Sequence, residues 1–150
     1  IDKQELSEGL SEQVELQAHY EQRALRGNKN NNIHLMKSFL SHLFPDFKFH
    51  DESYKTLRLA TDIKAFLMQL DKIKEYCKKR NPKLIRAEKV KGHNKTYKLV
   101  RKISNGHDNT GRIYFIEDSG KVFLLIGSKH NQENDFKKMK RYEKKMQNSN

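Results

Sequence analysis

Basic side chains that could hold phosphate groups recur on the segments of strand character in the second half of the chain. Lys98 and Arg101 lie in one such stretch, Arg112 opens a second, and Lys129 and His130 follow a third. Lys and Arg bind phosphate oxygens, and His is the side chain that titrates closest to neutral pH. These residue types favour binding or chemistry on a phosphate-rich partner.

The charge of the whole chain agrees with such a partner but is unevenly placed. The 150 residues include 31 Lys and Arg against 19 Asp and Glu, a net charge of +12. Residues 1–25 hold six acidic and two basic side chains, so they carry −4 and residues 26–150 carry +16. The basic part predicts a polyanionic partner such as nucleic acid or a ribosomal surface. The acidic segment could shield that surface, bind another partner, or be a solvated helix without a regulatory role.

Several other kinds of chemistry are excluded by residue type and spacing. Cys77 is the single cysteine, so an intrachain disulfide and a cysteine zinc site are both impossible. The seven histidines form no His-x-x-x-His pair with a Glu, and no glycine-rich phosphate loop is present. No apolar run reaches 18 residues. We therefore expect no metal, no cofactor and no membrane partner, and a reducing, cytoplasmic location.

The elements that must position the basic residues follow from periodicity and from turn residues. The first half predicts helices and one short strand: helix 4–25, a polar linker at 27–32, helix 32–44, strand 47–49, and a helical stretch 52–80 with a restart at 61–62. The second half predicts a strand meander and a helix: strand 96–103, loop 104–111, strand 112–117, turn 118–120, strand 121–127 and helix 131–146. This order predicts an α+β fold, a small antiparallel sheet packed with N-terminal helices and a basic C-terminal helix. We expect residues 1–30 to be an extension and residues 31–150 the main domain.

An ordered set of segments in the second half carries a family resemblance. It comprises Lys89-Val-Lys-Gly92, Tyr97-Lys98-Leu-Val-Arg101, Arg112-Ile-Tyr-Phe and Leu125-Ile-Gly-Ser-Lys129-His130. Over roughly residues 46–145 this set resembles the RelE/ParE superfamily of bacterial type II toxins. The resemblance implies a RelE-like fold and, in the RelE-like branch, a metal-free endoribonuclease that cuts messenger RNA on the ribosome. It also implies a cognate antitoxin partner, and a homodimer is possible.

The resemblance assigns a candidate catalytic set. Lys98 matches a strand lysine of the family, Arg112 the arginine that opens the third strand, and Lys129 a late-strand arginine. His130 resembles the histidine that other branches use. In this chemistry the RNA 2′-hydroxyl attacks the neighbouring phosphate, basic residues stabilise the developing negative charge, and His is the usual acid or base. The family's C-terminal tyrosine has no counterpart at the expected place, for which Tyr142 is a possible replacement.

The remaining basic residues are candidates for nucleic-acid binding without sequence preference. They are Lys91, Arg101, Lys102, Lys137, Lys138 and Arg141. By strand alternation, Lys102 falls on the same face as Lys98.

Two other functions and several plainer roles stay open. The same fold could serve a ParE-like gyrase inhibitor, or a non-catalytic nucleic-acid or ribosome-binding module of a longer protein. Arg112 could simply pair with Glu117 or Asp118, Lys98 could be an ordinary exposed strand residue, and His130 could be a loop residue. Tyr97 and Tyr114 are best interpreted as core or rim aromatics, and Cys77 as a core residue.

Overall fold

The computed structural model describes residues 29–81, 83–101, 103–104 and 110–148. The helix predicted over 4–25 and almost all of the proposed extension 1–30 lie outside these residues, as does Lys102. The elements, in chain order, are α2 (Lys29–Leu43), β1 (Phe47–Phe49), α3 (Asp51–Leu59), α4 (Ile63–Lys79), β2 (Ala87–Lys89), β3 (Tyr97–Leu99), β4 (Ile103–Ser104), β5 (Thr110–Asp118), β6 (Lys121–Ser128), the 3-10 turn η1 (Lys129–Asn131) and α5 (Gln132–Asn148).

The strands form one sheet in the order β1-β6-β5-β3-β2, and β4 also pairs with β5. All neighbours are antiparallel except β1 and β6, which are parallel. The predicted α+β class is confirmed, and the sheet is mostly antiparallel. The parallel pair was not predicted, because periodicity alone does not show which strands become neighbours.

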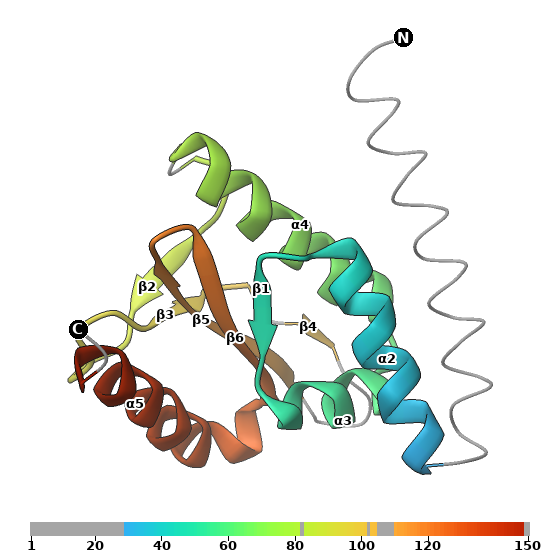
Figure 1. The fold of residues 1–150 in the computed structure, drawn as a ribbon. Helices are drawn as coiled ribbons and strands as arrows, with labels where there is room; N and C mark the ends of the chain where they lie inside the picture. The colour runs from blue at the N-terminus through green and yellow to red at the C-terminus, as the bar shows by residue number, and fades with distance from the viewer. Residues whose placement is uncertain (1–28, 82, 102, 105–109, 149–150) are drawn as a thin grey trace, which may run out of the picture.

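Helices cover both faces of this sheet (Figure 1), with α2, α3 and α4 on one side and α5 on the other. Along β5, Ile113 and Phe115 join the core beneath α2–α4, whereas Tyr114 and Ile116 join a second cluster with Met139 of α5. Successive strand residues point to opposite faces, so a strand covered on both faces is apolar throughout. This explains the nearly continuous apolar run of β6, which lies between β1 and β5 in the sheet.

The expected restart within residues 52–80 is a clean break between two helices. Ala60 leaves the helical conformation, and the Asp62 side chain caps α4 by accepting a hydrogen bond from the backbone N–H of Ala65 at 3.1 Å. Asp is among the preferred residues at this position because its oxygen satisfies an N–H that has no partner within the helix.

A two-residue turn joins β5 to β6 and fixes their register. Ser119 and Gly120 have φ values of 51° and 85°, and Asp118 pairs directly with Lys121. Two successive positive φ values are typical of the hairpin turn whose twist matches that of its strands. The prediction of this turn is confirmed.

The strand predicted over 96–103 is wrong in extent. β3 ends at Leu99, and pairing with β5 resumes only at Ile103. The backbone N–H of Val100 instead donates to the carbonyl of Arg86, at the start of the unpredicted strand β2. Strand β2 was not predicted because three residues are too few to show an alternating pattern.

Candidate nucleic-acid interface

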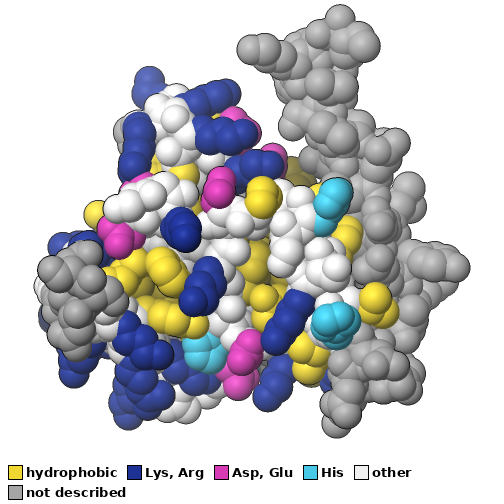
Figure 2. All heavy atoms as spheres, viewed as in Figure 1, with side chains coloured by type: hydrophobic (Ala, Val, Ile, Leu, Met, Phe, Trp, Pro, Cys, Tyr) yellow, Lys and Arg dark blue, Asp and Glu magenta, His cyan; other side chains and the backbone are white. Residues whose placement is uncertain are grey.

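Helix α5 presents a strongly basic surface because its inward face holds two of its three acidic residues. Asp135, Met139 and Glu143 are spaced four residues apart and are 1%, 0% and 5% exposed. Side chains four apart share one face of a helix. The opposite side, here called the basic face, consists of exposed Lys137, Lys140, Arg141, Lys144 and Lys145. Figure 2 shows dark blue side chains gathered where α5 runs, at the lower left.

Glu143 fixes α5 to the turn between β2 and β3. Its carboxylate accepts hydrogen bonds from the backbone N–H groups of Asn94 (3.1 Å) and Lys95 (2.8 Å) and from the Thr96 hydroxyl (2.6 Å). Burial acts to raise the pKa of Glu143, but these hydrogen bonds leave its pKa below the ordinary value. The basic face and the 93–96 turn are therefore held together by a buried, ionised carboxylate.

His93 and Lys140 complete this junction. The His93 ring lies 3.1 Å from the Thr96 hydroxyl and 3.7 Å from a Glu143 oxygen. Burial is the main reason that the pKa of His93 is lowered, so the ring is neutral at neutral pH. Lys140 donates to the carbonyl of Gly92 at 3.1 Å, which draws the turn against the basic face.

Two of the four predicted catalytic residues lie on the sheet face covered by α5. Lys98 pairs with Tyr114 across the strands, and Arg112 lies two residues before Tyr114 on β5. Lys98 is half-buried, with its amine 4.0 Å from Glu88. Arg112 is also half-buried, and its Nε has no hydrogen-bond partner among the described residues. The alternative in which Arg112 pairs with Glu117 or Asp118 is not what the structure shows, since these carboxylates pair with Arg80 and Lys95.

The Asp135 side chain of α5 packs against this sheet face at Gly127. Gly127 pairs with Arg112, and a methyl group at position 127 would lie only 2.1 Å from Asp135 Oδ2. Any side chain at position 127 would therefore displace the Asp135 carboxyl, which lies directly against the strand. Burial raises the pKa of Asp135 to about 6, against a partial opposing effect from Lys138, whose amine is 4.0 Å away. Burial likewise raises the pKa of Tyr114, which is fully buried.

Lys129 and His130 lie outside the sheet in the turn η1, and both are exposed. This turn follows β6 directly, and Ser128 at the end of β6 pairs with Gly111, next to Arg112. The structure thus brings Arg112, Lys129 and His130 to one end of the β5–β6 hairpin. Lys98 lies on the same face as Arg112 but further along the sheet.

The predicted nucleic-acid-binding residues are distributed over two regions. Lys137 and Arg141 belong to the basic face, whereas Lys138 is half-buried beside Asp135. Lys91 and Arg101 are exposed on the connections that follow β2 and β3.

Three tyrosines and the single cysteine lie in or beside the core. Tyr114 is a core aromatic, as predicted, and Tyr97 is a rim aromatic that is 40% exposed. Cys77 is half-buried at the margin of the core, where burial raises the pKa of its thiol. Tyr142, the possible replacement tyrosine, is half-buried and packs against His50 and Phe123.

The sequence did not lead us to Asp135 and Glu143, the two carboxyl groups that are buried beneath α5. The available signal was their spacing around Met139, which places both acidic residues on the apolar stripe of an otherwise basic helix.

Comparisons with known proteins found no matching family model, no matching curated protein and no matching solved structure. Within the part of the chain that the structure describes, no helix is long and apolar enough to cross a membrane. The same residues contain no group of three His, Cys, Asp or Glu side chains that could hold a metal ion.

Proposed function

We propose that this protein binds RNA, with the basic face of α5 as the principal contact surface. The observation that carries the proposal is the burial of Asp135 and Glu143, which removes two negative charges from the surface of a helix that displays five exposed cations. A row of Lys and Arg on a rigid helix follows a phosphate backbone without reading its sequence.

Neutralising one stripe of this surface should weaken RNA binding. Lys137, Arg141 and Lys144 lie at spacings of four and three, so the triple variant K137Q/R141Q/K144Q removes three neighbouring charges. We expect its Kd for a single-stranded RNA of about 15 nucleotides to rise roughly 10-fold to 30-fold at moderate salt, as measured by fluorescence anisotropy.

The matched control removes the same charge from the other side of the sheet. The variant K37Q/K55Q/K72Q takes one lysine from each of α2, α3 and α4, and its Kd should stay within about threefold of the wild-type value. Equal weakening by the two triple variants would show that only net charge matters and would contradict a specific contact surface on α5.

RNA cleavage of the toxin type is a second candidate function, and a different observation favours it. The backbone places Arg112, Lys129 and His130 at the same end of the β5–β6 hairpin. Cations there can stabilise the charge that develops during 2′-hydroxyl attack on phosphate. We propose messenger RNA on the ribosome as the substrate and an antitoxin as the protein partner. The RelE/ParE resemblance of the sequence supports these assignments.

Cleavage should depend on the residues at this end of the hairpin. In a translation mixture with a defined message, we expect wild-type protein to cut the RNA. We expect Arg112→Ala and His130→Ala each to reduce the rate at least about 100-fold, as primer extension would show. Lys121→Ala, which removes an exposed cation at the other end of the β5–β6 hairpin, should keep most of the activity.

Two results would exclude the nuclease. An intact message at stoichiometric protein would contradict cleavage altogether. Inhibition of gyrase supercoiling without RNA cleavage would favour the ParE-like alternative, and RNA binding with neither activity would leave a binding module.

A further inference from the structure

A pocket of about 380 Å³ lies on the opposite side of the sheet from α5, at the end of α4. Its walls come from the last turn of α4, the strands β2, β3 and β5, and the 93–96 turn. The lining residues include Tyr76, Arg80, Asn94, Lys95, Tyr97 and Phe115. This volume lies at the lower end of the range for pockets that bind small molecules.

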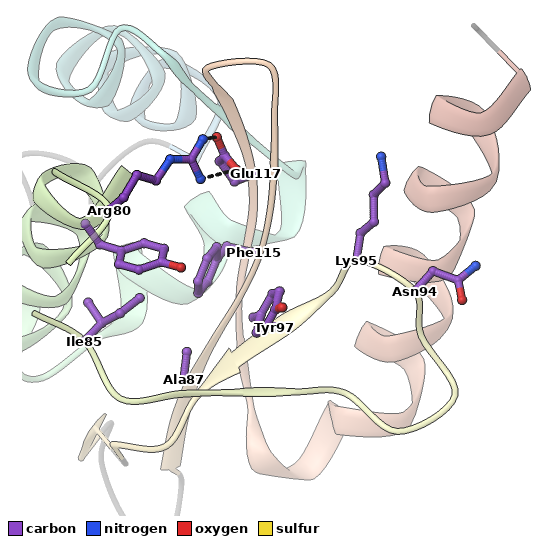
Figure 3. Close-up of a pocket in the computed structure, with 9 residues that line it drawn as sticks. Arg80, Ile85, Ala87, Asn94, Lys95, Tyr97, Phe115 and Glu117 are labelled. Atoms are coloured by element: carbon purple, nitrogen blue, oxygen red, sulfur yellow. Dashed lines mark hydrogen bonds and ion pairs between the residues drawn. The ribbon is translucent and has the colours of Figure 1, made fainter. Parts of the chain in front are cut away.

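Aromatic rings form the apolar part of this pocket. Tyr97 and Phe115 are cross-strand partners whose rings stack, with centroids 5.8 Å apart and planes at 25°. Tyr97 is 40% exposed, whereas Phe115 is buried, so Tyr97 is the accessible ring of the stack. Tyr76 adds a third ring from α4, and Figure 3 shows Tyr97 and Phe115 side by side above Ala87. An exposed aromatic face held by a buried ring is the usual platform for an unpaired nucleobase.

Charged groups at the rim are fixed in place. Arg80 binds Glu117 through both terminal nitrogens, one of them at 2.8 Å. This two-point ion pair holds the planar guanidinium next to the aromatic rings, as the dashed lines in Figure 3 indicate. A guanidinium plane also stacks on nucleobases.

The pocket is connected to the basic face through the 93–96 turn. Asn94 and Lys95 line the pocket, and the backbone N–H groups of the same two residues donate to Glu143 of α5. Figure 3 shows these residues between the pocket and α5. An RNA strand that lies on α5 therefore needs to cross one short turn to place a base beside Tyr97.

We propose that this pocket receives an unpaired nucleobase of the RNA, stacked on Tyr97. The inference rests on the proposed RNA binding and extends it by assigning single-stranded RNA as the substrate class. Because a stacked base must leave its duplex, the protein should bind single-stranded RNA better than a duplex of the same length.

Replacing Tyr97 tests the stacking interaction. We expect Tyr97→Ala to raise the Kd for single-stranded RNA about 5-fold to 100-fold, whereas Tyr97→Phe, which keeps the ring, should stay within about twofold of wild type. With 2-aminopurine in the RNA, wild type and Tyr97→Phe should quench its fluorescence, and Tyr97→Ala should not. Leu59→Ala removes another exposed apolar side chain, outside the pocket, and should change neither quantity.

The outcomes separate the pocket from the proposed function. If RNA binds and the α5 triple variant weakens it, but Tyr97→Ala changes neither affinity nor quenching, the pocket inference is wrong and RNA binding stands. If wild-type protein does not bind RNA, the proposed function fails and the pocket inference fails with it. Circular dichroism melting of each variant shows whether a lost affinity reflects unfolding.

Discussion

Replacing Glu143 by Ala should lower the free energy of unfolding by about 3–4 kcal/mol, because the change leaves one buried and two partly buried donors without their acceptor. The carboxylate is almost completely buried and serves two backbone N–H groups and the Thr96 hydroxyl. Urea denaturation at pH 7 measures the effect. Glu133→Ala, which removes an exposed acidic residue from the first turn of the same helix, should cost less than about 1 kcal/mol.

The pH dependence of this loss has a defined sign. Because the pKa of Glu143 is lowered in the folded protein, its stabilisation is present above the ordinary value of 4.5. This stabilisation is lost as the pH falls through the lowered folded pKa. The stability difference between wild type and Glu143→Ala should therefore shrink in acid. A difference that is small at pH 7, or constant down to pH 3, would contradict a buried, ionised Glu143.

Asp135→Asn should have the opposite effect and stabilise the protein at neutral and alkaline pH. Burial raises the pKa of Asp135 from 3.8 to about 6, so this carboxyl contributes stability below pH 3.8 and loses it as the pH rises through 6. The shift corresponds to about 3 kcal/mol. Asn does not titrate. The stability of Asp135→Asn minus that of wild type should therefore rise by up to about 3 kcal/mol between pH 4 and pH 8.

Thermal or urea unfolding across this pH range measures the change for Asp135. Asp46→Asn, at an exposed carboxylate, provides the control and should show a difference from wild type that stays within about 0.5 kcal/mol at every pH. If the stability difference between Asp135→Asn and wild type is the same at pH 4 and pH 8, ionisation of Asp135 carries no penalty in the folded protein, and the assignment of a penalised buried charge is wrong.

Local signals in the sequence predicted most of the elements. Pro45, Asp62 and Gly120 mark boundaries that the structure confirms, because each limits the backbone within one or two residues. The parallel pairing of β1 with β6 depends on contacts between residues about 75 positions apart, and no local pattern encodes it. The same limit applies to β2, whose three residues are defined by their partner strand.

The candidate interface was predictable in charge but not in geometry. The basic character of residues 137–145 is plain in the sequence, whereas the inward orientation of Glu143 requires knowledge of where the 93–96 turn lies. The pocket beside Tyr97 combines residues from α4 and three strands, so it exists only in the folded chain. The catalytic set derived from the resemblance stays a prediction, although the backbone places Arg112, Lys129 and His130 at the same end of the β5–β6 hairpin.

The most direct test of the central claim is the salt dependence of RNA binding by wild-type protein and the K137Q/R141Q/K144Q variant. Each phosphate contact to a single strand contributes about −0.7 to the slope of log K against log salt concentration. We expect a wild-type slope of about −3 or steeper and a slope about 2 units shallower in the variant, because three contacts on α5 are lost. Binding that is absent or insensitive to salt, or identical slopes for the two proteins, would contradict RNA binding through the basic face of α5.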